Sequence, residues 1–236
     1  MDPDELNRRL SWLGAGTELL TGTVDELSDE ELAAPSLLPG WTRAHLVGHL
    51  ARNADALVNL LDWARTRVET PMYPNPESRE DDIERSAKQP PAVLRADMRN
   101  GIVRLDEAIR AMPPTAWQVT VRTNRGRPVP AAEVPWMRVR EVWVHAVDLG
   151  GRADFADVPV EIGAALLTDA FFFAARQPAV PPVRLLATDA ELELRLGDPD
   201  TVPDEVRAPV RELLPWALGR HRPASAADWP QLPAWL

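Results

Sequence analysis

Residues 138–150 read Arg-Val-Arg-Glu-Val-Trp-Val-His-Ala-Val-Asp-Leu-Gly, and they predict a helix that both packs in a core and carries a site. The stretch follows Pro135 and ends at Gly150, which are typical start and stop signals of a helix. Glu141 and His145 are four residues apart and therefore share one helix face, beside an apolar face. Such pairs are also common on solvated helices, where they contribute a few tenths of a kcal/mol, so the spacing alone does not establish a site.

Three more helical segments precede this one. Apolar residues recur at helical spacing in each, and turn-forming residues separate them. The expected segments are 4–33, with a break at Gly14–Gly16 or an end near Thr23, then 43–68 capped by Thr42, and 78–111 with a break at 89–91. Residues 115–133 suit a hairpin. Four helices with short connections predict an up-down bundle.

Residues 151–236 have a different pattern. Residues 183–188 and 191–197 read as strands, the second with strict alternation of apolar and polar side chains. Helices are expected at 159–177 and 204–219. The predicted fold is therefore a helical bundle domain over residues 1–152 and a smaller α/β domain over residues 153–236.

Composition and charge exclude several classes of function. The chain has 236 residues and a formal net charge of −10, which disfavours binding to nucleic acid because no basic stripe is present. No run approaches the roughly 18 apolar residues of a membrane span. The N-terminus is acidic and lacks the apolar core of a signal peptide, so a cytoplasmic monomer without membrane contact is expected.

The chain contains no cysteine, which leaves His, Asp and Glu as the possible metal ligands. One histidine of segment 43–68 would complete a His2Glu set with Glu141 and His145. Such a set leaves the fourth zinc position open, as in catalytic zinc sites. His49 is the better candidate because it lies deeper in the helix than His45, for which a supporting or packing role is expected.

Four stretches resemble one known family, and together they extend over nearly the whole chain. They are Trp41-Thr42-Arg43-Ala44-His45 with His49 and Asn53, Glu69-Thr70-Pro71-Met72-Tyr73, residues 136–150, and Leu232-Pro233-Ala234-Trp235-Leu236. These stretches are similar to the mycothiol-dependent maleylpyruvate isomerases of the DinB-like metalloenzyme superfamily. The resemblance implies a DinB-like four-helix bundle followed by a smaller C-terminal α/β domain.

The resemblance also implies the residues of the site. Zinc, or another divalent metal, would be held by His49, Glu141 and His145. An arginine after a helix that ends in Gly-Arg would come from the second domain, and Arg220 matches that pattern. Arg222 follows two residues later, so the choice between the two arginines is open.

The implied reaction is the cis-trans isomerisation of maleylpyruvate to fumarylpyruvate, a step in gentisate-type aromatic degradation. Since the protein has no thiol, mycothiol would supply one. Bound to the metal, it would lose its proton more readily and add reversibly to the double bond. Arg220 is the best candidate to bind a carboxylate of the substrate, and Arg138, Arg140 and Arg52 are weaker ones.

Two other functions are compatible with the same residues. A mycothiol-dependent S-transferase or detoxifying enzyme would share the metal ligands and differ in its pocket. A non-enzymatic metal-binding regulatory module would use the bundle for contact with a partner. Metal content and an isomerase assay distinguish the three.

Overall fold

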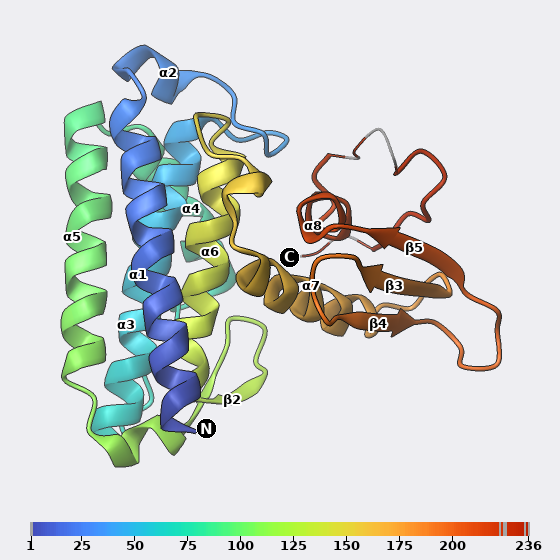
Figure 1. The fold of residues 1–236 in the computed structure, drawn as a ribbon. Helices are drawn as coiled ribbons and strands as arrows, with labels where there is room; N and C mark the ends of the chain where they lie inside the picture. Colours follow the sequence, from blue (N-terminus) through green and yellow to red (C-terminus); the bar gives the residue numbers. More distant parts are fainter. Residues whose placement is uncertain (1, 222, 224–225, 234, 236) are drawn as a thin grey trace. The chain divides into compact units, whose positions relative to one another are not determined.

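A computed structural model of the protein describes residues 2–221, 223, 226–233 and 235. The chain divides into two compact units, Met1–Ala153 and Asp154–Leu236. The first is a bundle of helices, and the second combines helices with a small sheet (Figure 1). The predicted fold class is confirmed.

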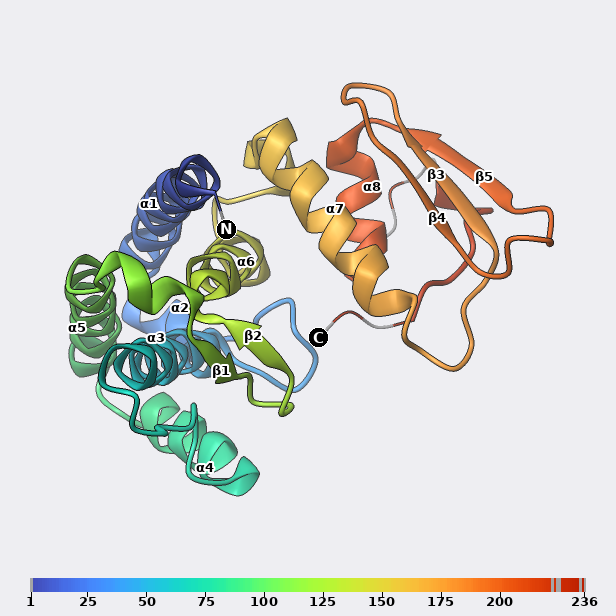
Figure 2. The same ribbon diagram turned by 90° about the horizontal axis from the view of Figure 1, so that it is seen from below.

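The first unit is built around one central helix, α3. Helices α5, α4 and α6 all pack on α3, while α1 packs mainly on α6 (Figure 2). The helices of this unit are α1 (Pro3–Glu26), α2 (Asp29–Ala33), α3 (Arg43–Thr66), α4 (Pro76–Ala87), α5 (Pro91–Arg110) and α6 (Val134–Asp148). The predicted interruption at residues 89–91 separates α4 from α5. Thr42 caps α3 as expected, because its hydroxyl accepts from the backbone N–H of His45.

Helix α1 has no break at its glycines, and it extends to Glu26, so the expected interruption is wrong. Gly16 instead lets α1 approach α6 closely. A Cβ at this position would lie 2.6 Å from both Nε1 of Trp143 and Cγ2 of Val142. The indole of Trp143 donates to the carbonyl of Trp12 at 2.9 Å, which fixes the ring against α1.

Replacing Gly16 by alanine is expected to lower the free energy of unfolding by about 1–3 kcal/mol, because the added methyl overpacks a close helix contact. Gly14 is the matched control. It lies in the same helix, and a Cβ there would meet nothing within 4 Å. Gly14→Ala should therefore stabilise the protein by about 0.5–1 kcal/mol through helix propensity. Urea unfolding of both variants measures the difference, and equal shifts would contradict the close contact.

A short hairpin connects α5 to α6, as the sequence predicts. A 3-10 helix (Pro114–Gln118) precedes strand β1 (Thr120–Arg122), and β2 (Pro128–Pro130) pairs with β1 antiparallel. A second 3-10 helix (Ala131–Glu133) then leads into α6. Val121 and Val129 of the hairpin are buried in the same apolar cluster as Leu57 and Met137. The hairpin therefore packs on α3 and anchors the first turn of α6.

The second unit contains a three-stranded sheet with two helices. Strand β3 (Val183–Ala187) is central, and it pairs antiparallel with β4 (Glu193–Leu196) and parallel with β5 (Asp204–Ala208). After a 3-10 helix (Phe155–Asp157), helix α7 (Val160–Ala174) packs on β4 and on α8 (Val210–Ala217).

The helix predicted at 204–219 is wrong in its first half, which forms β5. Val206 and Ala208 are buried, and Arg207 between them is exposed, which is the alternation of a strand. Pro209 is extended and precedes a new helix rather than continuing one. The side chain of Arg184 on β3 pairs with Glu193 on β4 and with Glu205 on β5, which ties the three strands together.

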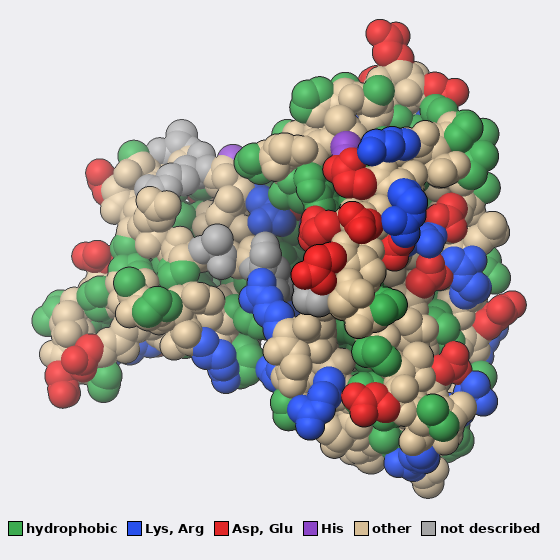
Figure 3. Space-filling model, turned by 180° about the vertical axis from the view of Figure 1, so that it is seen from behind, with side chains coloured by type: hydrophobic (Ala, Val, Ile, Leu, Met, Phe, Trp, Pro, Cys, Tyr) green, Lys and Arg blue, Asp and Glu red, His purple; other side chains and the backbone are tan. Residues whose placement is uncertain are grey.

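In the described part of the chain, each helix is too short or too polar to cross a membrane. Figure 3 shows acidic and basic side chains interspersed over one face of the helical unit. That face has no continuous basic surface.

Candidate metal centre

Two helices bring together the three residues that the sequence nominates as ligands. His49 lies in the second turn of α3, and Glu141 and His145 lie one turn apart on α6. Nε2 of His49 is 2.8 Å from Oε2 of Glu141, and Nε2 of His145 is 3.1 Å from the same oxygen. One ligand atom from each side chain lies within 4.8 Å of the others. Two imidazole nitrogens and one carboxylate oxygen at these distances suit a zinc ion with one position left open.

Further side chains hold the two imidazoles in place. Nδ1 of His145 is 2.8 Å from Oδ2 of Asp148, whose side chain is fully buried. Such a carboxylate fixes the orientation and tautomer of a metal-binding histidine. The ring of His49 packs on the indole of Trp41, with 5.5 Å between the ring centroids. Both imidazoles therefore have restricted orientations.

Hydrogen bonds and burial set the charges of the cluster. Burial lowers the pKa of His49 and outweighs its hydrogen bond with Glu141. Burial would also lower the pKa of His145, but hydrogen bonds with Asp148 and Glu141 raise it to about 9. Burial opposes ionisation of Glu141, yet hydrogen bonds from His145 and His49 hold its pKa well below its usual range. In this hydrogen-bonded arrangement Glu141 is an anion, His145 a cation and His49 neutral at pH 7.

Metal binding is therefore expected to release a proton from His145. The affinity for zinc should rise by about tenfold per pH unit up to the pKa of about 9, because binding requires the neutral imidazole. Competition with a chelator between pH 6.5 and 8.5 measures this slope. Asp148→Asn removes the carboxylate that raises the pKa, so the slope should flatten in that variant. An affinity independent of pH in the wild-type protein would contradict a protonated His145.

A buried cation lies one turn before Glu141 on α6. The side chain of Arg138 is only 1% exposed. Its Nη1 donates to the carbonyl of Leu50 at 2.8 Å and to Oδ1 of Asn53 at 2.7 Å, and its Nη2 has no hydrogen-bond partner among the described residues. Burial lowers the pKa of Arg138 to about 10, while the charge of Glu141 opposes the shift. Arg138 thus stays charged and offsets the buried charge of Glu141.

The other residues that the sequence nominates lie elsewhere. His45 completes the cap of α3, because its Nδ1 accepts from the backbone N–H of Thr42, and its Nε2 contacts Glu84 at 3.2 Å. Its role is thus in the helix start. Arg220 lies after α8 in the second unit, where its Nη1 donates to the carbonyl of Leu218 at 2.8 Å. Arg222 lies outside the described residues.

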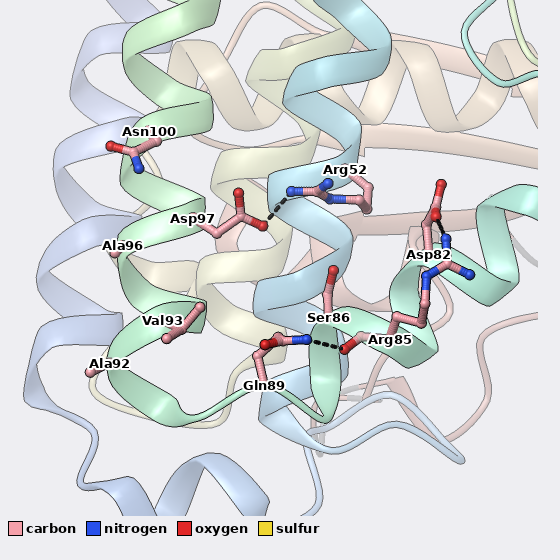
Figure 4. Close-up of a pocket in the computed structure, with 10 residues that line it drawn as sticks. All are labelled: Arg52, Asp82, Arg85, Ser86, Gln89, Ala92, Val93, Ala96, Asp97 and Asn100. Atoms are coloured by element: carbon pink, nitrogen blue, oxygen red, sulfur yellow. Dashed lines mark hydrogen bonds and ion pairs between the residues drawn. The ribbon is translucent and has the colours of Figure 1, made fainter.

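A groove on the outer side of the first unit is distinct from the metal centre. It has a volume of about 710 Å³ and lies between α3, α4 and α5. Its charged side chains pair with one another, Arg52 with Asp97 and Arg85 with Asp82 (Figure 4). Arg52, a weaker candidate for substrate binding, faces this groove and also pairs with Asp55 at 3.3 Å. Asp97 and Asp55 therefore neutralise the charge of Arg52 in this groove, which His49 and His145 do not line.

Sequence reasoning missed one residue of the centre, Arg79 on α4. Its Nη2 lies 3.4 Å from Nδ1 of His49. Arg79 stands among acidic residues in a polar segment, so neither periodicity nor a local motif distinguishes it. Only the packing of α4 on α3 brings it to the centre.

Comparison with known proteins gives consistent results. Residues 13–150 match a family model described as the mycothiol maleylpyruvate isomerase N-terminal domain. A solved structure of a mycothiol-dependent maleylpyruvate isomerase, and one of its variant with a histidine replaced by alanine, each superpose with a TM-score of 0.91. Their sequences are 36% identical to this one, and the match covers 98% of this chain and 97% of theirs.

Two curated relatives are uncharacterized proteins from two strains of Mycobacterium tuberculosis. Each is 33% identical over 143 residues, which is 58% of this chain and 53% of the relative. The alignment thus spans about half the length of these relatives.

Proposed function

Because the chain belongs to the mycothiol maleylpyruvate isomerase family, whose model matches more than half of it, we propose that it is a mycothiol-dependent isomerase that converts maleylpyruvate to fumarylpyruvate. The observation that carries the proposal is the convergence of His49, Glu141 and His145 on one point. A carboxylate and two imidazoles with a fourth position open are the donor set of a catalytic metal rather than of a structural one.

His49, Glu141 and His145 would hold a divalent metal, with zinc as the best match to two nitrogen donors and one oxygen donor. A metal at this position would lower the pKa of a thiol bound to it, as zinc does for water. Asp148 keeps Nε2 of His145 directed at the metal position through its contact with Nδ1. The positive charge of Arg138 partly offsets the negative charge of Glu141.

The protein has no cysteine, so the thiol must come from a separate molecule. Reversible addition of a thiolate to the substrate double bond, with the electron pair moving onto the conjugated carbonyl, permits rotation before the thiolate leaves. No atom is gained or lost overall, and no redox partner is needed. The chain must supply positively charged side chains that bind the two carboxylates and stabilise the negative charge developing on the enolate.

We assign the binding of one carboxylate to Arg220, within a C-terminal domain of residues 153–236. The guanidinium of Arg220 lies 5.9 Å from the ring centroid of Trp235, and the turn after α8 holds its backbone. A guanidinium binds a carboxylate through two parallel hydrogen bonds, which fixes the position of the substrate as well as its charge.

Metal analysis combined with an absorbance assay tests the proposal. Purified protein should contain one divalent metal, and it should isomerise maleylpyruvate with mycothiol but not without it. A haloarene electrophile should be a poor substrate. Conjugation of the haloarene without isomerisation would instead establish an S-transferase. Zinc binding with neither activity would point to a regulatory module.

A further inference from the structure

The two histidines of the metal centre differ in what their outer nitrogens contact. Nδ1 of His145 faces the carboxylate of Asp148, which is an acceptor. Nδ1 of His49 instead faces Nη2 of Arg79 at 3.4 Å. A guanidinium has five N–H donors and no acceptor. Arg79 therefore donates to Nδ1 of His49 as long as that nitrogen carries no proton.

A metal bound at Nε2 changes this contact. A neutral imidazole has one ring proton, so coordination through Nε2 leaves the proton on Nδ1. Metal-binding histidines almost always donate this N–H to a carboxylate, a carbonyl or water. Among the described residues, the hydrogen-bond partner of His49 Nδ1 is Arg79, which cannot accept. With metal bound, the Nδ1–H of His49 and an N–H of Arg79 are therefore both donors, and they need an acceptor that both can reach.

Arg79 is well placed to receive that acceptor from solvent. Burial raises the pKa of the Tyr73 hydroxyl, and the positive charge of Arg79 opposes this rise. Nη1 of Arg79 pairs with Glu80 at 2.6 Å, but the Glu80 side chain is 65% exposed, and such surface pairs contribute little. The Arg79 side chain is itself 24% exposed, so a small anion reaches it without unfolding α4.

We propose that Arg79 and the Nδ1–H of His49 together bind one carboxylate of the substrate, which makes Arg79 a specificity-determining residue supplied by the first unit. The inference rests on the proposed function, since it assigns one of the two carboxylates of a dicarboxylate. Charge-assisted hydrogen bonds from an arginine and an imidazole select a carboxylate over a neutral group of the same shape.

Binding of maleate to the zinc-loaded protein without thiol tests the proposal, because no turnover is required. Titration calorimetry should show maleate binding to the wild-type protein. Arg79→Met should weaken it by about tenfold to a hundredfold through the loss of charged hydrogen bonds, at unchanged zinc content. Arg79→Lys should recover part of the affinity.

Arg85→Met is the matched control, since Arg85 lies on the same helix and pairs with Asp82 at the surface. It should bind maleate like the wild-type protein. Equal maleate affinity in Arg79→Met and wild type, or no binding to wild type, would overturn the subsite. So would loss of zinc in Arg79→Met, which would make Arg79 a support of the ligand set. If maleate binding depends on Arg79 but wild type does not isomerise maleylpyruvate, the proposed function alone fails.

Discussion

Replacing Glu141 by glutamine is expected to abolish both metal binding and isomerase activity while leaving the bundle folded. The carboxylate oxygen of Glu141 contacts both imidazoles, and it supplies the one negative charge among the three donors. The glutamine amide has the same size as the carboxylate, but it carries no charge and binds a metal more weakly. Loss of even a supporting residue costs about tenfold to a hundredfold in metal affinity, so loss of a ligand should cost more.

Zinc content by elemental analysis, turnover of maleylpyruvate and circular dichroism measure the three parts of this expectation. Glu84→Gln is a suitable control, because Glu84 also contacts a histidine, His45, but at the exposed start of α3. It should keep both metal and activity. Full turnover by metal-free Glu141→Gln protein would refute the assignment of the centre.

Replacing Arg220 by alanine is expected to separate activity from metal content. Zinc should remain at the wild-type level, because the ligands belong to the first unit. Turnover should fall by about a hundredfold to a thousandfold, the usual effect of removing a group that stabilises developing negative charge. Arg220→Lys should recover part of the activity, since it keeps the charge but not the two parallel hydrogen bonds.

Arg211→Ala is the control for this variant, because Arg211 is exposed on α8 and is not assigned to the site. Steady-state kinetics with maleylpyruvate and mycothiol, together with metal analysis, give the answer. If Arg220→Ala turns over like the wild-type protein, the assignment is wrong. Arg222, the other arginine that the sequence offers, is then tested by the same replacement.

Local signals predicted most of the first unit. Thr42 starts α3, prolines separate α4 from α5, and the i, i+4 spacing puts Glu141 and His145 on one face. Each of these features depends on residues a few positions apart. Spacing along the sequence cannot show that His49 meets Glu141, because 92 residues separate them. The lack of cysteine and the depth of His49 in its helix made it the better candidate, and the family resemblance implies the same ligand set.

What the sequence missed depends on contacts between distant segments. Residues 204–208 form a strand because β3 offers an edge for parallel pairing, and nothing within the five residues signals that edge. Gly16 looks like a helix breaker until Trp143 is known to pack against it. Arg79 is one polar residue among many until α4 packs beside His49.

The wide separation of the metal ligands along the chain has a consequence for how the protein folds. A chain still in synthesis that ends before residue 141 contains His49 but neither Glu141 nor His145. A metal that needs all three side chains binds the finished bundle and not its precursors. Under the proposed function, such a metal would stabilise only the fully formed bundle, by about 2.7 kcal/mol at a free metal concentration one hundred times the dissociation constant. Metal depletion should accordingly speed unfolding while leaving early folding steps unchanged.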